Sequence, residues 1–228
     1  MNYRYLLIFL VSIGVSYLAT RWIRPVALKL KAVDHPSDRK MHVTPVPRLG
    51  GVGIWLGFMT ALAGFLIFQR FYPSELINLP ISREFLGILL GGFIILIVGI
   101  IDDIWSLTPF FKLGGQLAAA LVLVGFGVKM EFIGNPFGEP GALFYLGNIG
   151  ILMTVFWVIA FANIVNFIDG LDGLAAGISV IAGLTFFFFG LQTGQVGSSL
   201  MTLAIAGAAL GFLHHNFFPA KIFMGDSG

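Results

Sequence analysis

The chain lacks cysteine and carries few charges. None of its 228 residues is cysteine, and only 11% are Asp, Glu, Lys or Arg. The first absence excludes disulfides, zinc–thiolate sites, iron–sulfur clusters and cysteine nucleophiles. The second leaves too little polar surface for a water-soluble globule, in which about 25% of residues are charged. A net charge of +2 gives no reason to expect a nucleic-acid partner.

Hydrophobic residues make up 57% of the chain. They occur in blocks of about 20 residues, the length at which a helix crosses the hydrocarbon core of a bilayer. We therefore predict an all-α, polytopic membrane bundle of about seven transmembrane helices, forming one domain over residues 1–228. The predicted spans are 4–22, 50–69, 84–104, 112–129, 147–165, 172–191 and 199–216.

Two stretches between the spans have distinct compositions. Residues 23–49 are polar and contain proline, so we predict a loop. Turn signals within 130–146 separate short apolar pieces and predict a small hairpin on the membrane surface. The first span is followed by basic residues and has no small-residue cleavage site, which indicates an uncleaved helix rather than a signal peptide.

The basic residues predict the orientation in the membrane, because Lys and Arg concentrate in cytoplasmic loops. Threading the spans from an outside N-terminus places most of them inside: Arg21, Arg24, Lys29, Lys31, Arg39, Lys40, Arg48, Lys112 and Lys221. The remainder fall outside: Arg4, Arg70, Arg83 and Lys129. The same threading puts every aspartate and histidine inside and every glutamate outside. The inner face is therefore the expected location of any chemistry.

Asp102 and Asp103 end an apolar predicted helix. A charged side chain at the centre of a membrane costs about 2.5–3.5 kcal/mol on insertion scales, and a helix end that reaches water avoids much of this. Adjacent helical residues point about 100° apart, so the two carboxylates can have different roles. A solvated helix terminus is the simpler interpretation. Because the helix dipole disfavours acidic residues at a C-terminus, we favour a functional pair.

Polar residues recur every three positions from Asn163 through Asn166 and Asp169 to Asp172. On a straight α-helix, Asn163 and Asp172 would lie on opposite faces. The side chains converge only if the helix tightens or breaks, which the glycine after each aspartate permits. The alternative is an ordinary Asx-rich turn between two spans. Broken helices at membrane depth occur only in protein interiors or water-filled cavities, so we predict a second functional segment.

Two further segments carry weaker signals. Residues 223–228 place Asp226 between glycine and serine, where the backbone can approach an anion or a metal closely, although a plain turn is the simpler interpretation. The loop that contains Lys40 and Arg48 is either a topology determinant beside anionic lipid or a phosphate site, since arginine binds phosphate through two parallel hydrogen bonds. Carboxylates and cations at one membrane face fit magnesium and phosphate chemistry, because magnesium shares hard oxygen ligands with substrate phosphates.

Together the four motifs resemble those of the bacterial polyprenyl-phosphate N-acetylhexosamine-1-phosphate transferases (glycosyltransferase family 4), whose superfamily includes the phospho-MurNAc-pentapeptide translocase. The resemblance runs from Asp34 to Gly228, in the family's order and spacing. It implies Mg²⁺-dependent transfer, with Mn²⁺ as a substitute, of a sugar-1-phosphate from a UDP-N-acetylhexosamine to undecaprenyl phosphate, with release of UMP. The segment 44–48, Thr-Pro-Val-Pro-Arg, is similar to the GlcNAc-1-phosphate branch, which begins the synthesis of cell-envelope glycans such as lipopolysaccharide or teichoic acid.

The resemblance also implies a multi-pass location in the bacterial inner membrane, a cytoplasmic active site and a homodimer. Family members carry further spans, so residues 1–228 would form the N-terminal two thirds of a longer protein. The residue roles that it implies are catalytic for Asp102 and Asp103, metal binding for Asp169, Asp172 and Asp226, and substrate binding for Lys40, Arg48, Asn163, Asn166 and Asn216.

Two alternatives remain open. The first is the phospho-MurNAc-pentapeptide transferase activity of the same superfamily. The second is an ion-coupled secondary transporter, which would also place Asp and Asn in broken helices. Transporter sites lie near the bilayer midplane within structural repeats, whereas these polar groups gather at one face and no repeat is visible.

Overall fold

A computed structural model describes residues 3–34, 45–74, 77–139 and 141–228. The described chain forms seven helices: α1 Tyr3–Lys29, α2 Gly50–Phe71, α3 Arg83–Trp105, α4 Pro109–Gly125, α5 Ile149–Ile168, α6 Leu174–Gln192 and α7 Val196–Asn216. It also forms four short strands: β1 Val33–Asp34, β2 Val46–Pro47, β3 Phe132–Gly134 and β4 Leu143–Tyr145. The strands pair antiparallel, β1 with β2 and β3 with β4. The predicted helical membrane bundle and the hairpin within 130–146 are therefore confirmed.

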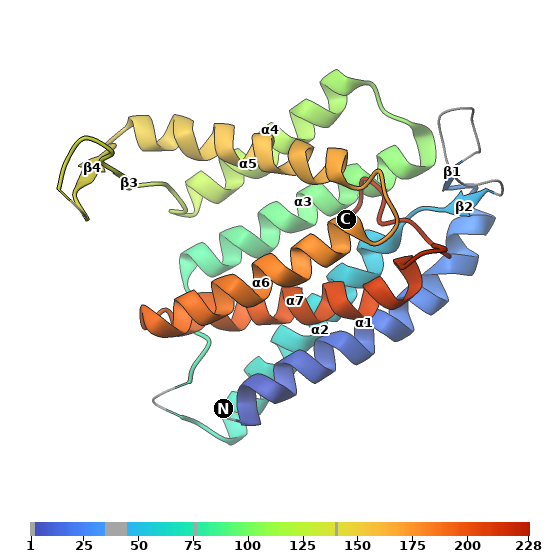
Figure 1. The fold of residues 1–228 in the computed structure, drawn as a ribbon, viewed down its shortest axis with the longest axis horizontal. Helices are drawn as coiled ribbons and strands as arrows, with labels where there is room; N and C mark the ends of the chain where they lie inside the picture. The colour runs from blue at the N-terminus through green and yellow to red at the C-terminus, as the bar shows by residue number, and fades with distance from the viewer. Residues whose placement is uncertain (1–2, 35–44, 75–76, 140) are drawn as a thin grey trace.

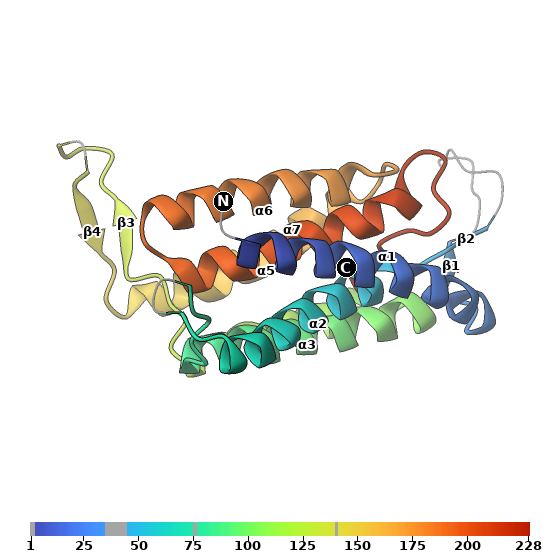
Figure 2. The ribbon, with the colours of Figure 1, turned by 90° about the horizontal axis from the view of Figure 1, so that it is seen from below.

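The two strand pairs mark opposite ends of the bundle. Figure 1 shows β3 and β4 beyond one end of the helices and β1 and β2 at the other, and Figure 2 shows the same separation from below. The C-terminal end of α3, α5 and α7 and the following residues 217–228 lie toward the β1–β2 end (Figure 1). Successive helices therefore run up and down, and their polar ends meet at one face.

Six of the helices are long and apolar enough to cross a membrane. The other, α4, has 17 residues, at the lower limit for a spanning helix. It begins at Pro109, before the predicted start at 112, because proline fits the first helical turn, where its missing N–H is not needed. It ends at Gly125, short of the predicted 129, and Gly127 follows with a left-handed φ of +99°.

The prediction of a loop over residues 23–49 was wrong for its first part. Helix α1 continues through Pro25 to Lys29. A proline inside a helix removes one hydrogen bond and normally kinks or ends it. Here Ala27 is fully buried in a cluster with Ala32 and Leu49, and this packing outweighs the cost. The basic residues that follow the first apolar stretch therefore lie on a regular helix.

The tightest packing joins α1, α2, α6 and α7. Helix α7 contacts the other three, and α1 also contacts α2. The core between them contains the buried side chains of Phe65, Phe187 and Leu200. Small residues let the helices approach closely: a Cβ added to Gly57 of α2 would lie 2.7 Å from Cβ of Ser16 on α1. A second group consists of α3, α4 and α5, in which α4 contacts both neighbours.

Candidate active site

Asp103 fixes the position of the C-terminal segment 223–228. Its buried carboxylate accepts the backbone N–H of Asp226 at 2.9 Å and that of Ser227 at 3.1 Å. Gly225 precedes them with a φ of +72°, and a Cβ added there would lie 2.6 Å from both carboxylate oxygens of Asp103. Only glycine fits this position. The two charge-assisted hydrogen bonds offset the unfavourable helix dipole at the end of α3.

Lys112, near the start of α4, links two of the predicted carboxylates. Its Nζ lies 2.8 Å from Oδ2 of Asp226 and 3.2 Å from Oδ2 of Asp102. The other oxygen of Asp102 accepts the backbone N–H of Leu107 at 2.7 Å. Asn166 donates a hydrogen bond to Oδ1 of Asp226. Asp226 is therefore held from three sides: by α4, by α5 and, through its backbone, by the end of α3.

Sequence reasoning placed Lys112 at the inner face but gave it no role in the site. A usable signal was present, because Lys112 and Gln116 stand four residues apart in an otherwise apolar helix and so share one face. Gln116 accepts a hydrogen bond of 2.8 Å from the side chain of Asn163 on α5. Gln116 therefore connects α4 to α5, whereas Lys112 connects α4 to Asp102 of α3 and to Asp226.

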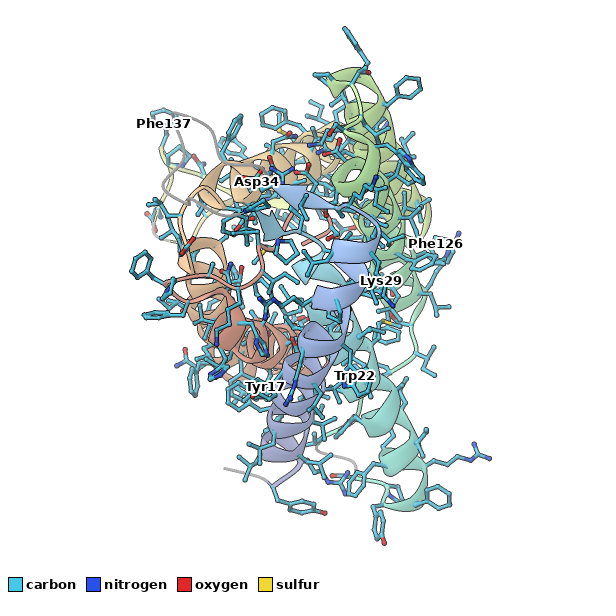
Figure 3. All side chains as sticks on the ribbon, turned by 90° about the vertical axis from the view of Figure 1, so that its right-hand side faces the viewer. Tyr17, Trp22, Lys29, Asp34, Phe126 and Phe137 are labelled. Carbon is cyan, nitrogen blue, oxygen red and sulfur yellow. The ribbon has the colours of Figure 1, made fainter. Side chains whose placement is uncertain are left out.

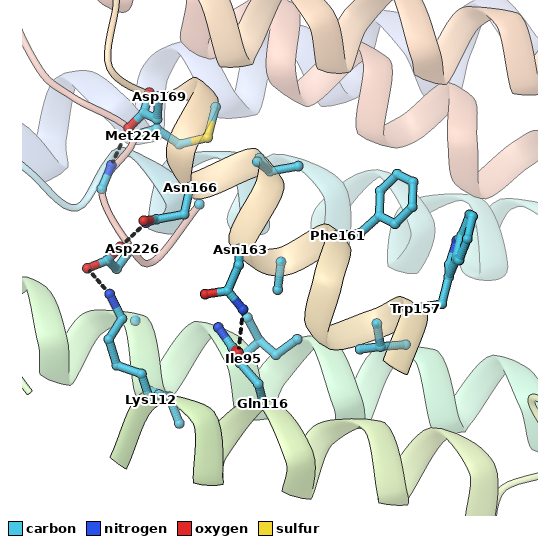
Figure 4. Close-up of a pocket in the computed structure, with 17 residues that line it drawn as sticks. Ile95, Lys112, Gln116, Trp157, Phe161, Asn163, Asn166, Asp169, Met224 and Asp226 are labelled. Atoms are coloured by element: carbon cyan, nitrogen blue, oxygen red, sulfur yellow. Dashed lines mark hydrogen bonds and ion pairs between the residues drawn. The ribbon is translucent and has the colours of Figure 1, made fainter. Parts of the chain in front are cut away.

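A cavity of about 420 Å³ opens between α3, α4, α5 and the C-terminal segment. Its polar part contains Lys112, Asn163, Asn166, Asp169 and Asp226. Its apolar part contains Ile95, Val98, Trp157, Val158 and Phe161. Figure 4 shows the charged side chains at one end and the two aromatic rings at the other. The cavity thus offers charged and apolar surface to the same ligand.

Helix α5 breaks where the polar repeat predicts a break. It ends at Ile168, Asp169 is its C-cap, and Gly173 adopts a left-handed φ of +75° before α6 begins. Asn163, Asn166 and Asp169 line the cavity, whereas Asp172 is not among the lining residues.

Two predicted site residues instead connect loops. Asp172 accepts the backbone N–H of Ala220 at 2.9 Å. Asn216 is buried, accepts the N–H of Gly173 at 3.0 Å and donates to the carbonyl oxygen of Ile222 at 3.0 Å. These bonds tie the α5–α6 turn to residues 217–228 and so position both beside the cavity.

Arg48, which directly follows β2, brings a second cation close to the polar end of the cavity. Arg48 forms an ion pair with Asp34 and lies close enough to Asp169 for its charge to offset part of the rise that burial causes in the pKa of that carboxyl. The backbone N–H groups of Gly50 and Gly51, at the start of α2, donate to the carbonyl oxygens of residues 223 and 224 at 3.0 and 2.9 Å. Lys40, the other predicted phosphate contact, lies outside the described residues.

Two carboxyl groups beyond the helices have shifted pKa values. Burial, assisted by the neighbouring charge of Asp103, raises the pKa of Asp169 to about 7, although the hydrogen bond from the N–H of Gly225 acts to lower it. The pKa of Asp226 is lowered. Burial alone would raise it, but hydrogen bonds with the side chains of Asp102 and Lys112 outweigh burial. The polar end of the cavity therefore holds two carboxyl groups with opposite pKa shifts, of which Asp226 keeps its negative charge more readily than Asp169.

A sequence comparison agrees with this site. The family model described as glycosyl transferase family 4 matches residues 85–228, which include every cavity-lining residue. The chain belongs to glycosyl transferase family 4. The resemblance predicted from the four motifs is confirmed.

Individual members of glycosyl transferase family 4 match over almost the whole chain. The probable undecaprenyl-phosphate N-acetylglucosaminyl 1-phosphate transferase of Bacillus subtilis is 37% identical over 99% of this chain and 59% of its own length. The decaprenyl-phosphate N-acetylglucosaminephosphotransferase of Mycobacterium tuberculosis is 40% identical over 97% of this chain and 56% of its own length. The phospho-N-acetylmuramoyl-pentapeptide-transferase of Desulforamulus reducens is 32% identical, with coverage of 96% and 69%. The chain thus spans a little over half the length of the first two relatives.

The donor set in this family 4 chain fits magnesium bound together with a substrate. Magnesium prefers oxygen ligands and commonly takes one or two carboxylates plus substrate phosphates and water. Asp169 and Asp226 line the same cavity, and the repulsion between their negative charges makes it unfavourable for both to be ionised. A divalent cation would offset this repulsion. Within the described residues, no group of three His, Cys, Asp or Glu side chains is arranged to hold a metal by itself. These residues therefore fit a magnesium ion that would be bound by two protein carboxylates and by oxygens of the substrate.

Proposed function

We propose that the full protein transfers GlcNAc-1-phosphate from UDP-GlcNAc to polyprenyl phosphate at the cytoplasmic face of the bacterial inner membrane. The product is polyprenyl-diphosphate-GlcNAc, and UMP is released. The Bacillus subtilis and Mycobacterium tuberculosis relatives, whose names give N-acetylglucosamine transfer, are 37% and 40% identical to this chain, against 32% for the Desulforamulus reducens pentapeptide transferase, which supports the GlcNAc branch.

The observation that carries the proposal is the two-part cavity. A polyprenyl phosphate has a charged head and an isoprenoid tail, and a cavity with charged residues at one end and Trp157 and Phe161 at the other accommodates both. The apolar end lies within the membrane-spanning part of α5, so the tail can remain in apolar surroundings while the phosphate reaches the polar end.

Phosphoryl transfer requires two anionic groups to approach each other, so positioning and charge neutralisation carry the catalysis. An oxygen of the lipid phosphate forms a bond to the β-phosphorus of the UDP-sugar, and the bond from that phosphorus to the oxygen bridging to the α-phosphate breaks. The ammonium of Lys112 lies at the polar end and offsets part of this charge. Mg²⁺, which Asp169 and Asp226 would hold, supplies further neutralisation of the phosphates when bound.

The paired aspartates of α3 act on the site through other residues. Asp103 holds the backbone that carries Asp226, and Asp102 holds Lys112. Neither aspartate lines the cavity in the described structure. We therefore propose that Asp103 is a positioning residue and that Asp102 sets the position of the Lys112 ammonium.

The proposal is tested with membranes that contain the full-length protein, added polyprenyl phosphate and radiolabelled UDP-GlcNAc. We expect a lipid-extractable labelled product and UMP in equal amounts with Mg²⁺, and loss of both with a chelator. A parallel reaction with UDP-MurNAc-pentapeptide distinguishes the two branches. Product formation that is undiminished by the chelator, or uptake of a solute without any labelled lipid, would contradict the proposal.

A further inference from the structure

A second cavity, of about 460 Å³, lies between α1 and the end of α7. Its lining residues are Tyr17, Arg21, Arg24, Pro25, Leu28, His214, His215 and Lys221. Three of these side chains are cationic, and none of the lining residues is acidic. No residue of this cavity lines the proposed active site, so the two are separate.

The cations of this cavity have no acidic partner in the part of the chain that the structure describes. The ion pairs found there involve other residues, and Arg21, Arg24 and Lys221 take part in none of them. Arg21 and Arg24 stand three residues apart on α1, so they share one helix face. Two guanidinium groups and one ammonium group therefore converge on one cavity, and their combined charge favours an anion.

The aromatic wall of the cavity is fixed by ring contacts. The ring of Tyr17 stacks on that of His215 at 4.7 Å and meets that of His214 edge-on at 5.1 Å. A ring nitrogen of His215 lies 3.1 Å from the carbonyl oxygen of Tyr17. The backbone N–H of Lys221 donates to the carbonyl oxygen of His215 at 2.9 Å. The exposed cationic side chains therefore border an open hollow whose wall is held in place by these ring and backbone contacts.

Exposed aromatic residues lie next to the cavity along the chain. Trp22, which follows Arg21, is 75% exposed, and Phe217 and Phe218 are also largely exposed. Exposed aromatic side chains at the ends of membrane helices are typical of the headgroup level of a bilayer. Figure 3 shows Tyr17, Trp22 and Lys29 in succession along α1 toward the end that bears Asp34. This level favours a lipid headgroup over an anion from solution.

We propose that this second cavity binds the phosphate group of an anionic membrane phospholipid. Arg21 and Arg24 suit phosphate oxygens because a guanidinium donates two parallel hydrogen bonds to them. Leu18, which is exposed and stands on the membrane side of the two arginines, provides an apolar surface along which an acyl chain can lie. The ligand class is a phosphate ester, and the membrane is its source.

The test uses the full-length protein purified in detergent and titrated with phosphatidylglycerol or phosphatidylcholine, with bound lipid counted by native mass spectrometry. We expect phosphatidylglycerol to bind at least about tenfold more tightly than phosphatidylcholine. The double variant Arg21→Gln/Arg24→Gln should lose about tenfold in phosphatidylglycerol affinity, since each basic residue contributes substantially to binding anionic lipid. Lys221→Gln should lose about threefold by the same reasoning.

The matched control is Lys29→Gln/Lys31→Gln. It removes the same charge from the last residue of α1 and from a position two residues beyond it, and neither lysine lines the cavity. Its affinity should remain within about twofold of wild type. Thermal unfolding without added lipid checks that each variant is folded, and Lys221→Gln carries the test if the arginine variant is not. Equal losses in the arginine and lysine variants, or no loss in any cavity variant, would overturn the proposal.

A competition experiment separates the two sources of phosphate. Glycerol 3-phosphate at millimolar concentration should displace little phosphatidylglycerol if the acyl chains contribute to binding. Full displacement at that concentration, with the same dependence on Arg21 and Arg24, would assign the cavity to a soluble phosphate ester and overturn the membrane lipid as its ligand.

Discussion

Helices α5 and α7 both carry asparagines toward the end that holds the carboxylates, but the two helices use them differently. In the most apolar stretch of α7, 56% of residues are buried, against 6% in that of α5. Asn216 of α7 is 1% exposed and bonds only to backbone groups. Asn163 and Asn166 of α5 line the cavity and bond to side chains of its walls. The same residue type connects backbone segments where packing surrounds it and lines the candidate site where it faces a cavity.

We expect the largest effect at Asp103, because this residue both anchors a backbone segment and positions the candidate site. An asparagine at this position would have one acceptor oxygen for two backbone N–H donors, and its own amide would face one of them. We expect Asp103→Asn to lower the rate of GlcNAc-1-phosphate transfer by at least about 100-fold, because the segment carrying Asp226 loses its anchor. The initial rate in membranes of full-length protein measures this.

The control for that variant is Glu131→Gln, at the β3–β4 end of the bundle. Glu131 is exposed, and its ion pair among the described residues is with Lys129, 3.3 Å away. Its transfer rate should stay within about twofold of wild type, since exposed ion pairs contribute little. A wild-type rate in Asp103→Asn would remove Asp103 from the proposed positioning role.

The contrast between α5 and α7 is tested by changing one asparagine on each. Asn216→Ala leaves the buried N–H of Gly173 and the buried carbonyl of Ile222 unpaired, at about 1–3 kcal/mol each. We expect its free energy of unfolding to fall by about 2 kcal/mol or more. Asn166→Ala should change stability by less than about 0.5 kcal/mol and still lower transfer about tenfold. Denaturation in detergent and transfer rates, measured on both variants, compare the two helices directly. Equal losses of stability in Asn216→Ala and Asn166→Ala would contradict the proposed difference between α7 and α5.

Lys112 provides a prediction of intermediate size. Lys112→Gln keeps a hydrogen-bond donor but removes the charge that faces Asp102 and Asp226. We expect transfer to fall about tenfold, because one cation at the polar end is lost. Lys112→Arg keeps the charge and should retain most of the rate. If both variants lose activity equally, the geometry of the ammonium rather than its charge is what matters.

The smallest effect is expected at the apolar end of the cavity. Trp157→Ala should raise the KM for polyprenyl phosphate about threefold and leave the KM for UDP-GlcNAc unchanged, since only the lipid tail would lose contact area. Trp105→Ala is the matched control, because Trp105 is exposed and does not line the cavity. A change confined to the UDP-GlcNAc constant would show that the tail lies elsewhere.

The helices were predictable because apolar blocks of spanning length are a strong local signal. Their ends were less predictable where local rules compete, as at Pro25, where the burial of Ala27 sustains α1. The gathering of the aspartates at one end followed from counting spans. Their partners did not, since Asp103 bonds to residues far along the chain. Choosing Asp169 over Asp172 as the cavity-lining residue requires knowing where α5 ends.

The cationic cavity between α1 and the end of α7 could not be predicted from the sequence. Arg21 and Lys221 come from opposite ends of the described chain, and only the packing of α1 on α7 brings them together. From the sequence, Arg21 and Arg24 had the ordinary role of setting topology. Lys112 is the opposite case, because its spacing from Gln116 is a local signal that the sequence itself contains.

The anchoring of residues 226 and 227 by Asp103 has a consequence for biosynthesis. The donor and the acceptor are 123 residues apart in the chain. At a synthesis rate of about 5–20 residues per second, the carboxylate leaves the ribosome on the order of ten seconds before its backbone partners exist. During that interval α3 enters the membrane with two acidic residues at its end and without the segment that will satisfy one of them. Asp103 therefore has to be satisfied by water at the membrane surface until residues 226 and 227 have been synthesised.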